Sequence, residues 1–247
     1  MVMLVDIGNT RIKWCWQDAL LDDLSVEAIT HTGWRDALAC LQQILLARTP
    51  AEVCLVHVLG DGFNKALVAL CHKYQIKLQQ VSAMTSSLYV KNGYEQIEQL
   101  GADRFVALHG AVYEYPSQAC IVVDCGTAIT IDLVDSKGQH QGGVILPGLQ
   151  LCLQSLIQNA EGLSQSADYS KQVLARNTAQ GISWGCINGL SGAIETIAEE
   201  MENQSLESCQ RIICGGDSQI VREYCQHDIT LRPHLVLQGL AYFTGNI

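Results

Sequence analysis

Short apolar runs alternate with polar turns at the start of the chain. Val2–Val5 is an all-apolar run that ends at Asp6, and Ile12–Trp16 follows a Gly8-Asn9-Thr10 turn. This pattern predicts two short strands joined by a tight turn, and a third short strand is expected over Val26–Thr30.

Helical and strand-like spacings then follow one another up to residue 115. Apolar residues recur at helical spacing in some segments and form compact runs in others, which separates helices from buried strands. The predicted elements are a helix over Trp34–Ala47, a strand over Val53–Val58, a helix over Phe63–Tyr74, a strand over Ile76–Val81 and, after the polar stretch 82–101, a helix over Asp103–Tyr115.

The same order of elements begins again in the second half. A strand is predicted over Ala119–Val123, running into Asp124, and two more follow over Ile129–Val134 and Gly142–Leu146. The repeated order of elements continues later with a strand at Ile212–Cys214, a Gly215-Gly216-Asp217 turn, a helix to about Tyr224 and a final segment, Leu235–Phe243.

The two halves carry matching turns. Asp-x-Gly-Asn-Thr at 6–10 and Asp-x-Gly-Thr at 124–127 lie close to half of the 247-residue chain apart, each at the end of an apolar strand. A repeat of this size indicates domain duplication. We therefore expect two α/β domains, over residues 1–115 and 116–247.

A helical insertion at about 160–203 distinguishes the second half. Glu161–Gln172 is polar and is expected to be mobile, whereas Thr178–Met201 has apolar residues at helical spacing. Four glycines line one stripe of this helix: Gly181, Gly185, Gly189 and Gly192. Because glycine lowers helix propensity, another backbone or a ligand is expected close to the stripe, with ordinary helix packing as the alternative.

Composition and charge narrow the class of protein. The chain is 48% hydrophobic and 16% charged, with a net charge of −10, which suits a globular protein and disfavours nucleic acids or anionic membranes as partners. The eleven cysteines are odd in number and form no C-x-x-C pair, so a reducing cytoplasm is expected. The charge-free stretch 138–160 is too polar to span a membrane, and no signal peptide is expected before the first strand.

The paired turns suit a phosphate site. Glycine allows close backbone approach, neighbouring N–H groups and a threonine hydroxyl donate to phosphate oxygens, and Asp6 and Asp124 offer oxygen ligands to Mg²⁺, directly or through water. Lys13 would reach the transferred phosphate as a point charge. The alternatives are two ordinary hairpins and a solvated lysine.

A second cluster, Gly101-Ala102-Asp103-Arg104, stands where a polar loop meets a helix start. Asp103 would accept the proton of an attacking hydroxyl while Arg104 holds an anionic group of the substrate, as phosphoryl transfer requires. Helix capping by Asp103 is the alternative. Gly215-Gly216 would let an adenine ring lie against the backbone, or serve as a plain turn. Walker A, Rossmann and zincin motifs are absent from the sequence.

Six motifs in order along nearly the whole chain resemble those of bacterial type III pantothenate kinases. They are Asp6-Ile7-Gly8-Asn9-Thr10-Arg11-Ile12-Lys13, Tyr94 with Gly101-Ala102-Asp103-Arg104, Asp124-Cys125-Gly126-Thr127-Ala128, Gly142-Gly143-x-x-x-Pro147-Gly148, Asn177-Thr178 and Gly215-Gly216-Asp217. The resemblance implies duplicated ribonuclease-H-like (actin-like) domains with an interdomain cleft. It also implies ATP-dependent phosphorylation of pantothenate to 4′-phosphopantothenate, the first step of coenzyme A biosynthesis.

The resemblance also implies roles for residues. ATP phosphates would contact the Asp6–Lys13 turn and Thr127, Asp124 would hold a monovalent cation (K⁺ or NH₄⁺), and Asp103 would be the proton acceptor. The implied pantothenate site is made of Tyr94, Gly101, Ala102, Asp103, Arg104 and Thr178. A homodimer joined through the second domains is implied as well, and residues 162–167 depart from the family by lacking a proline.

Two alternatives remain at this level. The same scaffold can serve a non-catalytic regulatory protein, because a fold does not determine a function. A kinase for another small hydroxyl substrate would keep the fold and change the pocket.

Overall fold

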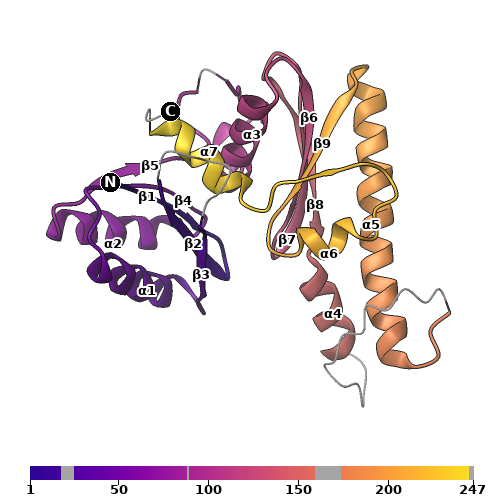
Figure 1. Cartoon of the computed structure of the whole chain (residues 1–247), viewed down its shortest axis with the longest axis horizontal. Helices are drawn as coiled ribbons and strands as arrows, with labels where there is room; N and C mark the ends of the chain where they lie inside the picture. Colours follow the sequence, from indigo (N-terminus) through magenta and orange to yellow (C-terminus); the bar gives the residue numbers. More distant parts are fainter. Residues whose placement is uncertain (18–24, 88, 159–173, 245–247) are drawn as a thin grey trace. The chain divides into compact units, whose positions relative to one another are not determined.

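The computed structural model describes residues 1–17, 25–87, 89–158 and 174–244 (Figure 1). The chain divides into two compact units. The first comprises Met1–Pro116, Gly138–His140 and the chain from His234 onward, and the second comprises Ser117–Lys137 and Gln141–Pro233. Each unit is built on a five-stranded sheet.

The helices and strands follow one another in an order that repeats. The first half contains β1 (Val2–Ile7), β2 (Arg11–Trp16), β3 (Glu27–Thr30), α1 (Trp34–Ala47), β4 (Glu52–His57), α2 (Gly60–Lys73), β5 (Lys77–Gln80), the 3₁₀ helix η2 (Ile97–Gln99) and α3 (Ala102–Glu114). The second half contains β6 (Ala119–Cys125), β7 (Ala128–Val134), β8 (His140–Pro147), α4 (Leu149–Gln158), α5 (Thr178–Ser205), β9 (Cys209–Cys214), α6 (Ser218–Arg222), β10 (Thr230–Leu231) and α7 (Leu235–Phe243).

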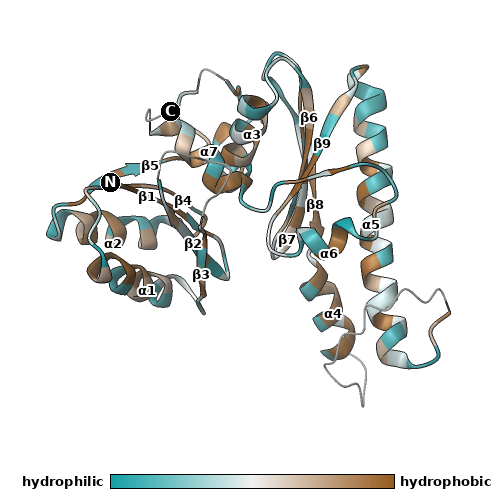
Figure 2. Ribbon diagram, in the orientation of Figure 1, coloured by the Kyte–Doolittle hydropathy of each residue, from teal (hydrophilic) through white to brown (hydrophobic). Residues whose placement is uncertain are grey.

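The first sheet has the strand order β3-β2-β1-β4-β5. β1 is antiparallel to β2 and parallel to β4, and β4 is parallel to β5. Side chains of β1 alternate between the two faces, so Met3, Val5 and Ile7 pack with the apolar stripes of α1 and α2. Leu4 and Asp6 lie on the opposite face. Figure 2 shows the hydrophobic character of these inner strands.

The helices α3 and α7 pack against each other and against the first sheet. Their crossing is close because glycine stands at the contact on both sides. A Cβ added to Gly239 in α7 would lie 2.2 Å from the carbonyl oxygen of Val106, and one added to Gly110 in α3 would lie 2.9 Å from that of Leu235. Neither position has room for a methyl group.

The second sheet has the order β10-β9-β6-β7-β8. Read from the other end, each strand has a counterpart in the first sheet: β6 pairs antiparallel with β7 and parallel with β9, as β1 does with β2 and β4. One face of this sheet packs on α4, α5 and α6 around a core that includes Ile121, Val123 and Ile187. The predicted duplication of an α/β domain is confirmed.

The units differ from the predicted contiguous division at residue 115 in two respects. Besides the chain up to Pro116, the first unit includes Gly138–His140 and α7, both of which the prediction assigned to the second domain. The physical reason is that α7 buries five apolar residues against α3, β1 and β4: Leu235, Val236, Leu237, Leu240 and Ala241.

The helix α5 begins at the predicted Thr178 and extends to Ser205, four residues beyond the predicted end. A Cβ added to Gly185, Gly189 or Gly192 meets no atom of the described chain within 4 Å. The expectation that another backbone or a ligand approaches this stripe therefore stays a prediction. The segment Glu161–Gln172 and the motif departure at 162–167 lie outside the described residues.

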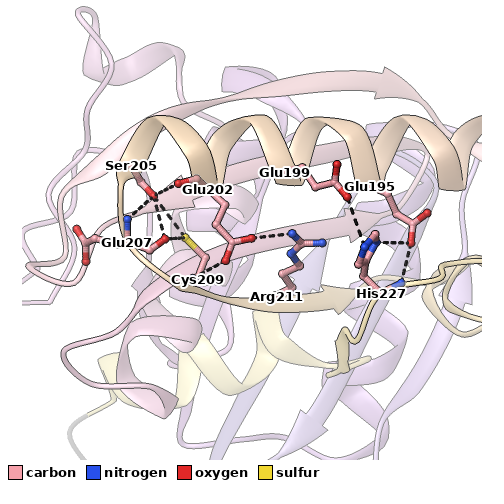
Figure 3. A network of polar contacts seen from close by, with 8 residues as sticks. All are labelled: Glu195, Glu199, Glu202, Ser205, Glu207, Cys209, Arg211 and His227. Atoms are coloured by element: carbon pink, nitrogen blue, oxygen red, sulfur yellow. Dashed lines mark hydrogen bonds and ion pairs between the residues drawn. The ribbon is translucent and has the colours of Figure 1, made fainter.

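A polar network fastens α5 to β9 and to the loop after α6 (Figure 3). Glu202 accepts from Arg211 Nη2 at 2.6 Å and from the Cys209 N–H at 3.0 Å. Glu195 accepts from the backbone N–H of His227 at 2.8 Å.

Among the described residues, no helix is long and apolar enough to cross a membrane.

Candidate active site

The first predicted phosphate turn joins β1 and β2. Asp6 is 8% exposed and lies opposite Lys13 in the strand register, with 3.9 Å between Lys13 Nζ and Asp6 Oδ2. Lys13 is thus held in an ion pair rather than being a plain solvated lysine. Burial, and then the positive charge of Lys13, lower the pKa of His234 at the start of α7. The charged side chains of Asp6 and Lys13 therefore lie on the face of the first sheet that α7 covers.

The tip of this turn presents its backbone and polar side chains. The Gly8 N–H donates to the Arg11 carbonyl at 3.0 Å, and Asn9, Thr10 and Arg11 are exposed. Ile7 and Ile12 are paired and fully buried in the core between the sheet and its helices. Of the predicted phosphate-binding residues here, these two isoleucines therefore offer only their backbone groups.

His31 also holds this turn, although it was not among the predicted site residues. The ring Nε2 of His31 lies 3.0 Å from the Gly8 carbonyl oxygen, and the backbone N–H of His31 donates to the Thr10 carbonyl at 3.0 Å. The side chain is 4% exposed. Its position just after β3 becomes significant only when β3 pairs with β2, so the linear sequence offered no signal.

The second predicted turn joins β6 and β7 and is one residue shorter than the first, because Cys125 pairs with Ile129 whereas Ile7 pairs with Ile12. The Gly126 N–H donates to the Ala128 carbonyl at 3.0 Å, and Thr127 is exposed. Asp124 is half-buried at the end of β6. Both turns thus place an aspartate, a glycine and an exposed threonine after a central strand.

Two distant motifs pack directly on the second turn. A Cβ on Gly148 would lie 2.4 Å from the Thr127 carbonyl oxygen, and one on Gly215, whose φ is +92°, would lie 2.3 Å from Asp124 Oδ1. The Asp217 N–H also donates to the Cys125 carbonyl at 3.0 Å. Glycine is required at both positions because the neighbouring backbone occupies the space of a side chain. The Pro147-Gly148 and Gly215-Gly216 motifs are therefore structurally part of this turn.

The predicted acceptor cluster lies at the start of α3. Gly101 is the N-cap residue of α3, Ala102 is its first residue, and no side chain caps it. Asp103 Oδ1 accepts from the Arg104 N–H at 2.8 Å, so the carboxylate contacts the first turn without being the N-cap that the alternative proposed. Asp103 is partly exposed. A Cβ on Gly101 would lie 2.6 Å from Asp103 Oδ1.

Tyr94 meets this cluster although it lies in the preceding loop. Arg104 Nη1 donates to the Tyr94 hydroxyl at 2.9 Å, and the Arg104 Cζ lies 5.5 Å from the centre of the Tyr94 ring. Arg104 is 6% exposed. The structure thus brings together Tyr94, Asp103 and Arg104. It adds His140, which stacks on Tyr94 and was not among the predicted site residues.

Thr178 is the exposed first residue of α5, and Asn177 caps this helix by accepting from the Gln180 N–H at 2.9 Å. Thr178 belongs to the second unit, whereas Tyr94 and Asp103 belong to the first. The expectation that they line one substrate site, and that Asp6 and Asp124 line one cleft, concerns the relative placement of the units and stays a prediction.

The described residues hold no group of three or more His, Cys, Asp or Glu side chains suited to a metal ion. Single carboxylates at strand ends, such as those of Asp6 and Asp124, fit a different kind of binding, in which the metal keeps several waters and takes most ligands from phosphates. The donor set therefore suits a metal that arrives with a nucleotide.

Comparisons with known proteins agree with this chemistry. Residues 2–200 match the family described as type III pantothenate kinase. The type III pantothenate kinase of Halorhodospira halophila is 34% identical, and the match covers 99% of this chain and 98% of that protein. That of Azoarcus sp. is 35% identical, over 98% of this chain and 89% of that protein.

Solved structures show the same fold at lower identity. A conserved putative Baf family transcriptional activator from Campylobacter jejuni has a TM-score of 0.63 and 20% identity, covering 99% of this chain and all of that one. An inorganic polyphosphate/ATP-glucomannokinase from Arthrobacter sp. has a TM-score of 0.54 and 14% identity, covering 99% and 98%. Both likenesses concern the fold alone.

Proposed function

The chain belongs to the type III pantothenate kinase family, and from that membership we propose how its residues carry out the reaction. The enzyme phosphorylates pantothenate with ATP, giving 4′-phosphopantothenate, the first step of coenzyme A biosynthesis. The observation that carries the assignment of residues is the contact cluster of Tyr94, Asp103 and Arg104 at the start of α3.

On the acceptor side, Asp103 is the catalytic base and Arg104 binds the carboxylate of pantothenate. The guanidinium of Arg104 is buried and held by Tyr94, which suits recognition of a carboxylate because little side-chain entropy remains to be lost. Asp103, the residue before Arg104 in the same helix turn, is partly exposed. A carboxylate beside the anchored hydroxyl is what phosphoryl transfer needs from the protein. Tyr94, Gly101, Ala102 and Thr178 complete the proposed pantothenate site.

On the nucleotide side, the Asp6–Lys13 turn and Thr127 bind the ATP phosphates. The exposed tip formed by Gly8, Asn9, Thr10 and Arg11 supplies N–H groups and polar side chains, while Ile7 and Ile12 contribute backbone groups. Lys13 is placed by its ion pair with Asp6 and provides positive charge for the transferred phosphoryl group. This arrangement supports nucleotide binding without a Walker A loop.

Asp6 would hold Mg²⁺ through water, and Asp124 would hold K⁺ or NH₄⁺. The packing of Gly215 against Asp124 Oδ1 supports the second assignment, because it brings the Cys125 carbonyl and the carboxylate to the same glycine. When bound, these ions neutralise phosphate charge. The protein's own contribution is to place the two carboxylates at the ends of β1 and β6.

We also propose a cytoplasmic homodimer. All eleven cysteines are free thiols, which suits a reducing compartment. The exposed stripe of Gly185, Gly189 and Gly192 on α5 supports a dimer, because small residues allow a second backbone to approach closely.

The Asp103→Asn variant tests the assignment. It keeps the shape of the side chain and removes the base, so we expect turnover of pantothenate to fall about 100-fold or more, with ATP binding unchanged in calorimetric titration. Unchanged turnover would disprove the role of Asp103. Measuring ATP consumption with pantothenate, simple sugars and acetate in parallel separates a pantothenate kinase from a kinase of another substrate and from a protein without activity.

A further inference from the structure

The tip of the hairpin between β7 and β8, Gly138–His140, belongs to the first unit, while the strands continue into the second. This hairpin tip pairs with Lys91. The Lys91 N–H donates to the Gly138 carbonyl at 2.9 Å, and the His140 N–H donates to the Lys91 carbonyl at 3.0 Å. The hairpin tip is therefore docked by backbone hydrogen bonds on the segment that carries Tyr94.

Two glycines show how closely these parts fit. A Cβ on Gly138, whose φ is +78°, would lie 1.9 Å from the Tyr89 carbonyl oxygen. A Cβ on Gly93 would lie 1.8 Å from the His140 carbonyl oxygen. Any side chain at either position would push the hairpin tip away from the loop that carries Tyr94.

The side chain of His140 completes this contact. It is 1% exposed, and its ring stacks on that of Tyr94 with 5.6 Å between ring centres and 19° between ring planes. Offset stacking at this separation is an attractive geometry for aromatic rings. Tyr94 in turn accepts the hydrogen bond of Arg104, so the contacts run from His140 through Tyr94 to Arg104.

We propose that His140 is a positioning residue for the acceptor site, whose ring holds Tyr94 at the angle at which the phenol oxygen fixes the guanidinium of Arg104. The inference rests on the proposed function, because that function assigns Arg104 to the carboxylate of pantothenate. The proposal predicts an effect on one substrate only. Loss of the His140 ring weakens binding of pantothenate and leaves ATP binding unchanged, since the Asp6–Lys13 turn makes none of these contacts.

The test compares His140→Leu, which removes the flat ring, with His140→Phe, which keeps it. Steady-state kinetics would give KM for each substrate. An aromatic pair is worth roughly threefold to tenfold in binding. We expect His140→Leu to raise KM for pantothenate about fivefold with KM for ATP unchanged, and His140→Phe to restore KM for pantothenate. Lys137→Ala, an exposed change in the same turn, is the matched control and should leave both constants unchanged.

An unchanged KM for pantothenate in His140→Leu overturns the proposal, and so does an equal rise in both constants. A His140→Phe variant that behaves like His140→Leu also overturns it, because the flat ring would then not matter. Thermal unfolding checks that each variant folds, and His140→Met replaces the leucine variant if the latter does not. A wild-type enzyme that fails to phosphorylate pantothenate would refute the proposed function instead, before any variant is compared.

Discussion

Replacing Gly239 by alanine would test the close crossing of α3 and α7. The added methyl group would lie 2.2 Å from the carbonyl oxygen of Val106 and 2.9 Å from its Cγ1. A carbon and a backbone oxygen cannot approach so closely, and neither backbone can rotate away as a side chain would. The two helices must therefore move apart.

The magnitude follows from two opposing terms. Overpacking in a well-packed core costs about 1–3 kcal/mol, and this contact lies at the upper end because backbone atoms stand on both sides. Alanine regains about 1 kcal/mol of helix propensity relative to glycine. We expect Gly239→Ala to lower the free energy of unfolding by about 2 kcal/mol, which for a chain of this size lowers Tm by roughly 4–8 °C.

Urea unfolding followed by circular dichroism measures this difference. The matched control is Gly62→Ala in α2, where an added Cβ would lie 3.7 Å from the Trp34 ring, an ordinary contact. There only the propensity term acts, so that variant should be as stable as the wild type or more so. If Gly239→Ala were as stable as Gly62→Ala, the steric reasoning about the α3–α7 crossing would be refuted.

Three further predictions concern pH, ions and assembly. The Cys209 N–H and then the Arg211 side chain hold the pKa of Glu202 below its ordinary value of 4.5. The contribution of Glu202 to stability is therefore present above that value and is lost as the pH falls through the lowered pKa. Glu202→Gln should flatten the dependence of the unfolding free energy on pH below about pH 4.5, and an unchanged dependence in urea titrations at acid pH would contradict this. Potassium should activate the wild-type enzyme over sodium, and Asp124→Asn should abolish the difference between the two buffers; equal wild-type rates in both would count against a cation at Asp124. Gly189→Glu, at a position where an added Cβ meets no atom of the described residues within 4 Å, should convert the proposed dimer to monomers in sedimentation without lowering Tm of the monomer, and a wild-type monomer would refute the dimer itself.

The local elements were largely predictable because each carries its own hydrophobic period. The helix over Trp34–Ala47 has the same bounds in the structure, and the strands after Asp6 and Asp124 differ from their predicted bounds by a few residues at most. The matching turns predicted the duplication, and the structure confirms it because the same strand order recurs in both sheets. Such features depend on neighbours within a few positions, and the sequence displays them directly.

The membership of α7 could not be predicted in the same way. A contiguous division is the simplest interpretation of a repeat, and the pattern of α7 shows only that it has apolar residues. Its place was decided by which surface could bury those residues, and that surface is formed by α3, β1 and β4 far back in the chain. Contacts at such sequence separations leave no mark on local periodicity.

By itself, the sequence determined the repeated strands, the turns with Asp6 and Asp124, and the position of Asp103 at a helix start, because hydrophobic spacing and turn chemistry act over short stretches of chain. Only the tertiary structure decided that His31 supports the first turn and that His140 stacks on Tyr94. These histidines have no distinguishing neighbours in the sequence. Their roles arise from strand pairing and hairpin docking, which bring His31 to Gly8, 23 positions away, and His140 to Tyr94.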